Sequence, residues 1–152
     1  MIVEFLRTLM WLTAFFSILP CPVRAEGLSS DSALLQGLGL DGRWAQNCSD
    51  PPAANNAFLV YLAPDDVAPS VQYYEDPGDI TTFPLSDVRQ LKNGDIEWVQ
   101  AEGEVMITLV TQVRGNRLRT WSAANSEGQA YVVRGKYSNG GQTPWFNKCE
   151  TN

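Results

Sequence analysis

Hydrophobic and polar residues alternate in short runs along most of this chain, and turn-forming residues separate the runs. Turn signals such as Pro64-Asp65, Asn93-Gly94 and Asn139-Gly140 recur at intervals of roughly a dozen residues. No segment keeps a helical period for more than about two turns. The pattern predicts a meander of antiparallel strands, with β-favouring runs at residues 58–62, 71–74, 80–85, 96–99, 105–113, 118–121 and 131–133.

One hairpin can be checked for internal consistency. A two-residue turn at residues 115–116 places Val113 opposite Leu118 and Gln112 opposite Arg119, so apolar meets apolar and polar meets polar. A slip of one residue reverses every side chain and destroys this match. Residues 105–121 are therefore expected to form a hairpin in this register.

About eight strands in up-and-down order need to protect their edges, and closure into a barrel does so. Cys48 follows the first expected strand, residues 42–47, and Cys149 follows the last segment, residues 144–146. A disulfide between them would join the first strand to the last. The fold class is therefore predicted as all-β, a single antiparallel up-and-down β-barrel with a Cys48–Cys149 bridge. An open sandwich with an end-to-end disulfide is the alternative.

The first 25 residues have the layout of a secretory signal peptide. An apolar run at 9–19 ends at Pro20 and Pro22, and Val23-Arg24-Ala25 follows. An uncleaved membrane anchor is the alternative, although the run is shorter than the roughly 20 residues that span a bilayer. Residues 26–40 are expected to be a lead-in with one loosely held helical turn, and residues 41–152 the barrel domain. The protein is expected to be secreted or periplasmic, where cysteines commonly pair.

Charge is unevenly distributed along the chain. Without residues 1–25 the formal net charge is −7. Residues 26–104 carry 14 acids and three bases, whereas residues 105–148 carry one acid and six bases. The acidic balance argues against nucleic acid as a partner, and no membrane span is expected after the signal.

The chain contains no histidine, which removes histidine-based nucleophile pairs and the usual zinc, copper and iron sites. No cofactor or metal is expected. The acidic run 75–79 is read as a solvated turn and not as a calcium site. Glu102 and Glu104 leave open a hydrolase that uses carboxylates alone, but the protein is expected not to be an enzyme.

Gly42-Arg43-Trp44 opens the first expected strand after a short lead-in. This resembles the Gly-x-Trp signature of lipocalins, the calycin-type family of small secreted barrels. The resemblance implies an eight-stranded barrel that binds a small ligand, with the Trp packed under an arginine from near the last strand. Arg134 is the position that matches that arginine. Small bacterial inhibitors of secreted metalloproteases look similar too, with a signal peptide, Gly-x-Trp, a barrel and one disulfide.

Two sets of side chains are candidate binding residues. A two-residue turn at Asn93-Gly94 would set Arg89 opposite Trp98, where it could bind a small anionic or apolar ligand inside the barrel. The alternative is that Arg89 lies at the rim, with its stem packed and its guanidinium group in water. The ligand-binding candidates are Arg89, Trp98, Tyr73 and Tyr131. The alternative is a protein-interaction module, such as a secreted protease inhibitor or an envelope partner, that uses a basic outer wall. The residues of that wall are Arg117, Arg119, Trp121, Arg134 and Lys136.

Overall fold

The computed structural model describes residues 30–150. The expected signal peptide at 1–25, which includes Cys21, and residues 26–29 lie outside the described part. Within residues 30–150, no helix has both the length and the apolar character needed to cross a membrane.

The described residues form one helix and ten strands, all antiparallel where they pair. In chain order they are α1 (Ser30–Gly37), β1 (Gly42–Ala45), β2 (Phe58–Leu62), β3 (Ser70–Asp76), β4 (Asp79–Gln90), β5 (Ile96–Glu102), β6 (Val105–Arg114), β7 (Arg117–Asn125), β8 (Ala130–Val133), β9 (Lys136–Tyr137) and β10 (Phe146–Lys148).

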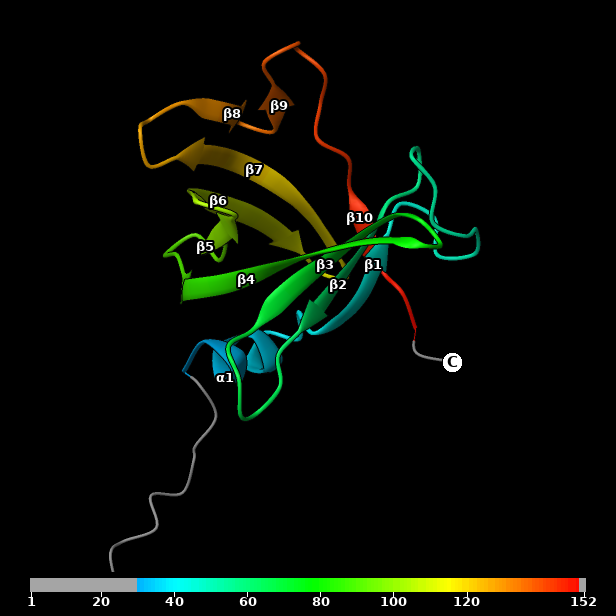
Figure 1. The fold of residues 1–152 in the computed structure, drawn as a ribbon, viewed down its shortest axis with the longest axis horizontal. Coiled ribbons are helices and arrows are strands. Elements are labelled where there is room, and N and C mark those ends of the chain that lie inside the picture. Colours follow the sequence, from blue (N-terminus) through cyan, green and yellow to red (C-terminus); the bar gives the residue numbers. More distant parts are fainter. Residues whose placement is uncertain (1–29, 151–152) are drawn as a thin grey trace, which may run out of the picture.

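Strands β1 to β7 follow one another around the sheet, each paired with its neighbour in the chain. β10 then pairs with β7 on one side and with β1 on the other, which closes a ring of eight strands. β8 and β9 form a hairpin outside this ring, on the second half of β7 and at the top of Figure 1. The predicted antiparallel barrel is confirmed, with one hairpin added before the closing strand.

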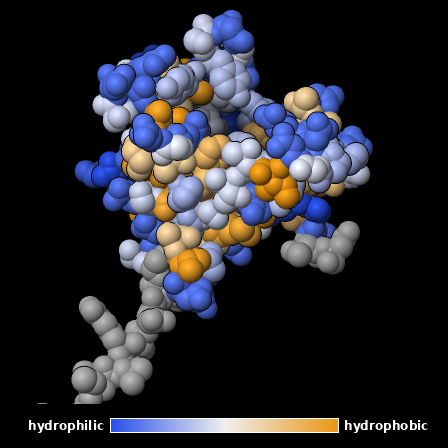
Figure 2. Space-filling model, in the orientation of Figure 1, coloured by the Kyte–Doolittle hydropathy of each residue, from blue (hydrophilic) through white to orange (hydrophobic). Residues whose placement is uncertain are grey.

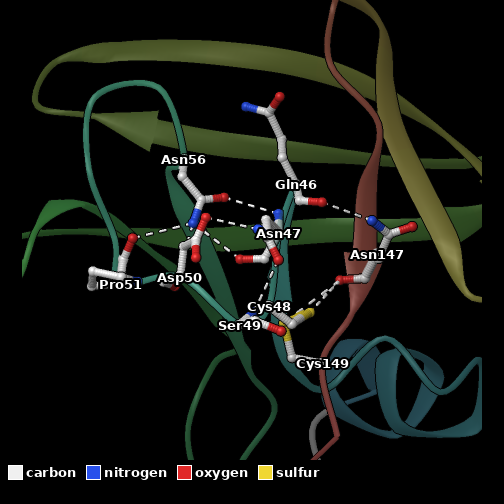
Figure 3. The surroundings of a disulfide bond; sticks show 9 residues. All are labelled: Gln46, Asn47, Cys48, Ser49, Asp50, Pro51, Asn56, Asn147 and Cys149. Atoms are coloured by element: carbon white, nitrogen blue, oxygen red, sulfur yellow. Dashed lines mark hydrogen bonds between the residues drawn. A yellow bond between two sulfur atoms is a disulfide. The ribbon is translucent and has the colours of Figure 1, made fainter.

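The disulfide joins the first and last strands of the ring, as predicted. Cys48 and Cys149 are bonded, with their Cα atoms 5.5 Å apart and 101 residues apart in sequence. Beside the bridge, the buried Asn56 side chain accepts from the Asn47 backbone N–H at 2.9 Å and donates to the Asn47 carbonyl at 3.0 Å (Figure 3). The loop between β1 and β2 is thus fastened at the seam of the barrel.

The β6–β7 hairpin has the predicted register. Val113 lies opposite Leu118, and Gln112 lies opposite Arg119. A bulge follows at Val110/Thr111, and beyond it Leu109 and Ile107 stay buried on the inner face.

The β4–β5 turn differs from the prediction by one residue. The Leu91 N–H donates to the Asp95 carbonyl, and Gly94 adopts a φ of 84°. This is a three-residue loop with glycine in the left-handed region, not a two-residue turn. Arg89 is therefore opposite Glu97 instead of Trp98. The expected position of Arg89 inside the barrel is wrong.

The helix closes one end of the barrel, at the bottom of Figure 1, where it packs against β4. Leu35 of α1 and Leu40 just after it have no exposed surface and belong to the main hydrophobic core. The Trp44 Nε1–H donates to the Leu40 carbonyl at 2.8 Å. The expectation that this helical turn is loosely held is wrong, because its apolar side chains complete the core. We call this end the floor.

Candidate ligand-binding site

The barrel interior is packed near the floor and hollow at the other end, where the β3–β4 and β5–β6 turns lie. Trp98 is 1% exposed and lies edge-to-face against Tyr61, with ring centroids 5.5 Å apart. Beyond this packed layer lies a cavity of about 310 Å³, and no residue of α1 lines it. We call this cavity the mouth; its lining residues are Tyr73, Glu75, Asp79, Thr81, Phe83, Gln100 and Glu102.

Strand alternation places these side chains together. On each of β3, β4 and β5 the lining residues are two apart, so they share one face of their strand. Register adds a lateral match, because Tyr73 lies opposite Thr81 on the neighbouring strand. On β5 the same face continues from buried Ile96 and Trp98 to Gln100. The residues of the mouth therefore lie on the same strand faces that form the core deeper in the barrel.

One polar group at the mouth lacks a partner among the described residues. Gln100 is 2% exposed, and its Nε2 donates to Glu102 Oε1 at 2.7 Å. Its Oε1 is buried and accepts no hydrogen bond from the described residues, and the buried Trp98 Nε1–H on the same strand face donates none. Buried polar atoms are paired in most native proteins, so an unpaired one asks for an explanation. Oε1 has almost no accessible surface, so a donor in the cavity reaches it only if the Gln100 side chain shifts.

Tyr73 forms an aromatic wall of the mouth. Its ring meets that of Phe83 edge-to-face, with centroids 5.5 Å apart. Burial raises the pKa of the Tyr73 phenol to about 12, and the Glu102 and Tyr137 charges add to this. Tyr73 therefore remains a neutral phenol at physiological pH.

Of the four ligand-binding candidates from the sequence, the structure places only Tyr73 in the lining of the mouth. Trp98 lies in the packed layer beneath it. Arg89 is on the outer face, where its mostly exposed side chain pairs with Glu97. Tyr131 is exposed on β8, and its hydroxyl accepts from Asn125 Nδ2 at 3.3 Å. The arginine that suggested an anionic ligand is thus outside the barrel.

Sequence reasoning missed the polar lining of the mouth. Gln100 and Glu102 follow Trp98 at intervals of two, just beyond the predicted run 96–99, and the structure extends that strand to Glu102. Extending the inner face of that run outward would have found both residues. Glu75 and Asp79 are exposed beside the β3–β4 turn, as predicted, and they also line the cavity that the turn borders.

The outer wall carries a row of stacked arginine and indole side chains. Arg117 lies over the Trp145 ring at 4.9 Å, and Arg119 lies over the same ring at 4.6 Å and over Trp121 at 5.1 Å. Arg119 Nε also donates to Gln112 Oε1 at 2.9 Å. We call this set the arginine–indole row. Trp145 joins two of the predicted patch residues, and sequence reasoning did not assign it.

The other two residues of the predicted patch lie in the β8–β9 hairpin. Arg134 and Lys136 are exposed, and Arg134 has a φ of 50° at the turn. Among the cation–π contacts of residues 30–150, neither takes part. Gly135 between them touches the row, since a Cβ there would lie 3.4 Å from Arg119 and Trp121.

Lys148, and not Arg134, packs over Trp44. The Lys148 ammonium lies 5.6 Å from the indole centroid and donates to the Gly39 carbonyl. The expected match of Arg134 to the lipocalin arginine is therefore wrong, and the cation comes from β10. Its position on the closing strand adds to the fastening of the floor.

In the part of the chain that is described, no three or more acidic or cysteine side chains come close enough together to hold a metal ion. On the face drawn in Figure 2, hydrophobic side chains form several separate patches among polar ones. Such scattered apolar groups are ordinary for a protein surface.

Comparisons with protein-family models, with curated proteins and with solved structures find no match to this chain. The geometry of the mouth and of the outer wall therefore carries the functional argument.

Proposed function

We propose that this protein is a non-catalytic, lipocalin-like binding protein that holds a small ligand in the mouth of its barrel. The observation that carries the proposal is the cavity of about 310 Å³ whose lining includes Gln100, a buried residue with an unsatisfied Oε1. Concave sites of this size with a few convergent polar groups are typical of small-molecule binding.

The proposed location is outside the cytoplasm, in the periplasm or the extracellular space. Its support is the Cys48–Cys149 disulfide together with the signal-like sequence at 1–25. Release of a mature chain that begins at Glu26 is the expected processing, and N-terminal sequencing of the exported protein tests it.

A pair of tryptophan substitutions tests the mouth as the binding site. Thr81 lines the cavity, whereas Thr82 next to it faces outward and accepts from Gln72 Nε2. Thr81→Trp fills the mouth without removing a buried group, and Thr82→Trp adds the same bulk outside. Native mass spectrometry of protein purified from its own host is the measurement. We expect an added small mass on the wild type and on Thr82→Trp, and a bare chain for Thr81→Trp.

A bare wild-type chain, or an added mass that Thr81→Trp retains, contradicts the proposal. Circular dichroism of both variants checks that the barrel is intact. Thr81 and Thr82 are both exposed positions of β4, so each variant is expected to fold.

The arginine–indole row supports a second candidate, a protein-interaction module that docks an acidic partner. Two guanidinium groups lie over the Trp145 ring on an otherwise acidic chain, and guanidinium groups bind carboxylates well. Arg117→Gln with Arg119→Gln removes the charge, and Lys92→Gln at an exposed site is the control. If one acidic host protein cross-links to the wild type and to the control but not to the double variant, the second candidate gains; equal cross-linking removes it.

A further inference from the structure

We infer that the ligand of the mouth is an organic cation, a compact ammonium compound; this rests on the proposed binding role of the cavity. The first support is charge. Three carboxylates line the cavity, from Glu75, Asp79 and Glu102, and no arginine or lysine lines it. All seven lining residues belong to the half of the chain that carries 14 acids against three bases. Such a field attracts cations and repels anions.

The second support is a shortage of hydrogen-bond donors. An ionised carboxylate can only accept, so the amide of Gln100 must turn its NH₂ toward Glu102. That orientation leaves Gln100 Oε1 as a buried acceptor without a donor. The lining thus offers carboxylate oxygens directly, and the carbonyl oxygen of Gln100 once that side chain shifts toward the cavity. An ammonium ligand brings the missing N–H donors, or the missing positive charge where it is fully alkylated.

The third support separates an organic cation from a metal ion. Within residues 30–150 the carboxylates do not form a group close enough to hold a metal. Two aromatic rings instead stand in the lining, Tyr73 and Phe83, edge-to-face with centroids 5.5 Å apart. Aromatic faces bind alkylammonium groups by cation–π attraction while carboxylates compensate the charge. The phenol of Tyr73 keeps its proton, so this side chain is a neutral part of the lining.

Titration calorimetry on the mature chain at low ionic strength tests this inference with four probes, two of which are matched in shape. Choline carries a quaternary ammonium, and 3,3-dimethyl-1-butanol is its uncharged counterpart of almost the same shape. 1,4-Diaminobutane is the second cationic probe, and butyrate the anionic one. We expect at least one cationic probe to bind tenfold or more tightly than 3,3-dimethyl-1-butanol and butyrate, and its affinity to fall as salt is added.

Two charge-only substitutions on the same strand provide the control. Glu102→Gln removes a carboxylate from the mouth and is expected to weaken the cation at least fivefold. Glu97→Gln makes the same change on the outer face, where Glu97 pairs with Arg89, and is expected to leave the affinity unchanged.

The outcomes separate the inference from the proposed function. If the neutral or anionic probe binds as well as the cations, or if Glu102→Gln behaves like Glu97→Gln, the cation inference is overturned while the binding role stands. A host-derived ligand that contains no basic or quaternary nitrogen has the same effect. If the host-purified chain is bare, the binding role itself is contradicted.

Discussion

The floor and the mouth are the two ends of one barrel, but their side chains are satisfied differently. At the floor, Trp44 is 2% exposed, donates to a carbonyl and lies beneath Lys148. At the mouth, three carboxylates lie around one cavity and Gln100 leaves an acceptor unpaired. The contrast indicates that the floor and the seam stabilise the fold, whereas neighbouring carboxylates and an unpaired acceptor at the mouth cost stability. Proteins commonly trade stability for function in this way.

Removal of the disulfide is expected to have the largest effect on stability. Cys48→Ala with Cys149→Ala opens a loop of 101 residues, and the chain-entropy account assigns such a link about 4–5 kcal/mol. Urea unfolding followed by tryptophan fluorescence measures the free energy of unfolding, with the wild type under non-reducing conditions as reference. A loss below about 1 kcal/mol would mean that β1–β10 pairing alone holds the seam.

The next largest loss of stability is expected when one buried side chain of the helix is shortened. Leu35→Ala empties a fully buried site in the core that α1 shares with the barrel, and such substitutions cost about 2–5 kcal/mol. Leu34→Ala, at a partly buried site on the same helix, is the control and should cost less than half as much. If both substitutions lower the free energy of unfolding by equally small amounts, α1 is loosely held, as the sequence suggested.

Alkaline pH is expected to weaken the fold through its buried phenols. The pKa of Tyr73 is about 12 in the folded chain and 10 ordinarily, and burial also raises that of Tyr61. The unfolded chain therefore loses these protons first. Stability is complete below pH 10 and falls as pH rises toward 12, by about 2 kcal/mol for Tyr73.

Tyr73→Phe should remove part of this pH dependence, because Tyr61 contributes the remainder. Tyr131→Phe, at an exposed site, should leave the dependence as it is in the wild type. Urea unfolding at pH 9, 10, 11 and 11.5 checks both. An identical slope in Tyr73→Phe and in the wild type would show that Tyr73 is not desolvated.

The smallest expected effect has the opposite sign. Gln100→Met keeps the shape of the side chain and removes the unpaired acceptor, so stability should rise by about 1 kcal/mol. Trp44→Phe at the floor, which loses a satisfied hydrogen bond, should lower it by about 1–2 kcal/mol. A lower free energy of unfolding in Gln100→Met than in the wild type would mean that the mouth, like the floor, stabilises the fold.

Sequence reasoning predicted the barrel well where two independent signals agreed. The register of the β6–β7 hairpin followed from a turn whose length and side-chain pairing both fitted, and the seam followed from the positions of Cys48 and Cys149. The Asn93-Gly94 dipeptide carried no such second signal. It serves two-residue and three-residue loops alike, and the difference of one residue moved Arg89 to the outer face.

The closing segment was beyond sequence reasoning for a different reason. β10 is only three residues long, too short for a hydrophobic period to be read. Its neighbour Trp145 stacks with two arginines, and its own Lys148 covers Trp44. These contacts depend on ring closure, which brings β10 beside β7 and beside β1, the latter about 100 positions earlier in the chain. The mouth is lined by three consecutive strands, so the face of each lining residue could be read from the sequence.

Amide chemical-shift mapping tests the contrast between floor and mouth most directly. A ¹⁵N-labelled mature chain is titrated with choline and with 1,4-diaminobutane, and the shifts are assigned by residue. The account predicts that backbone signals of Tyr73, Thr81 and Glu102 and the side-chain NH₂ of Gln100 move with a common affinity, while those of Leu35 and Trp44 stay in place. Shifts confined to Arg117 and Trp145, or no saturable shifts at all, would contradict it.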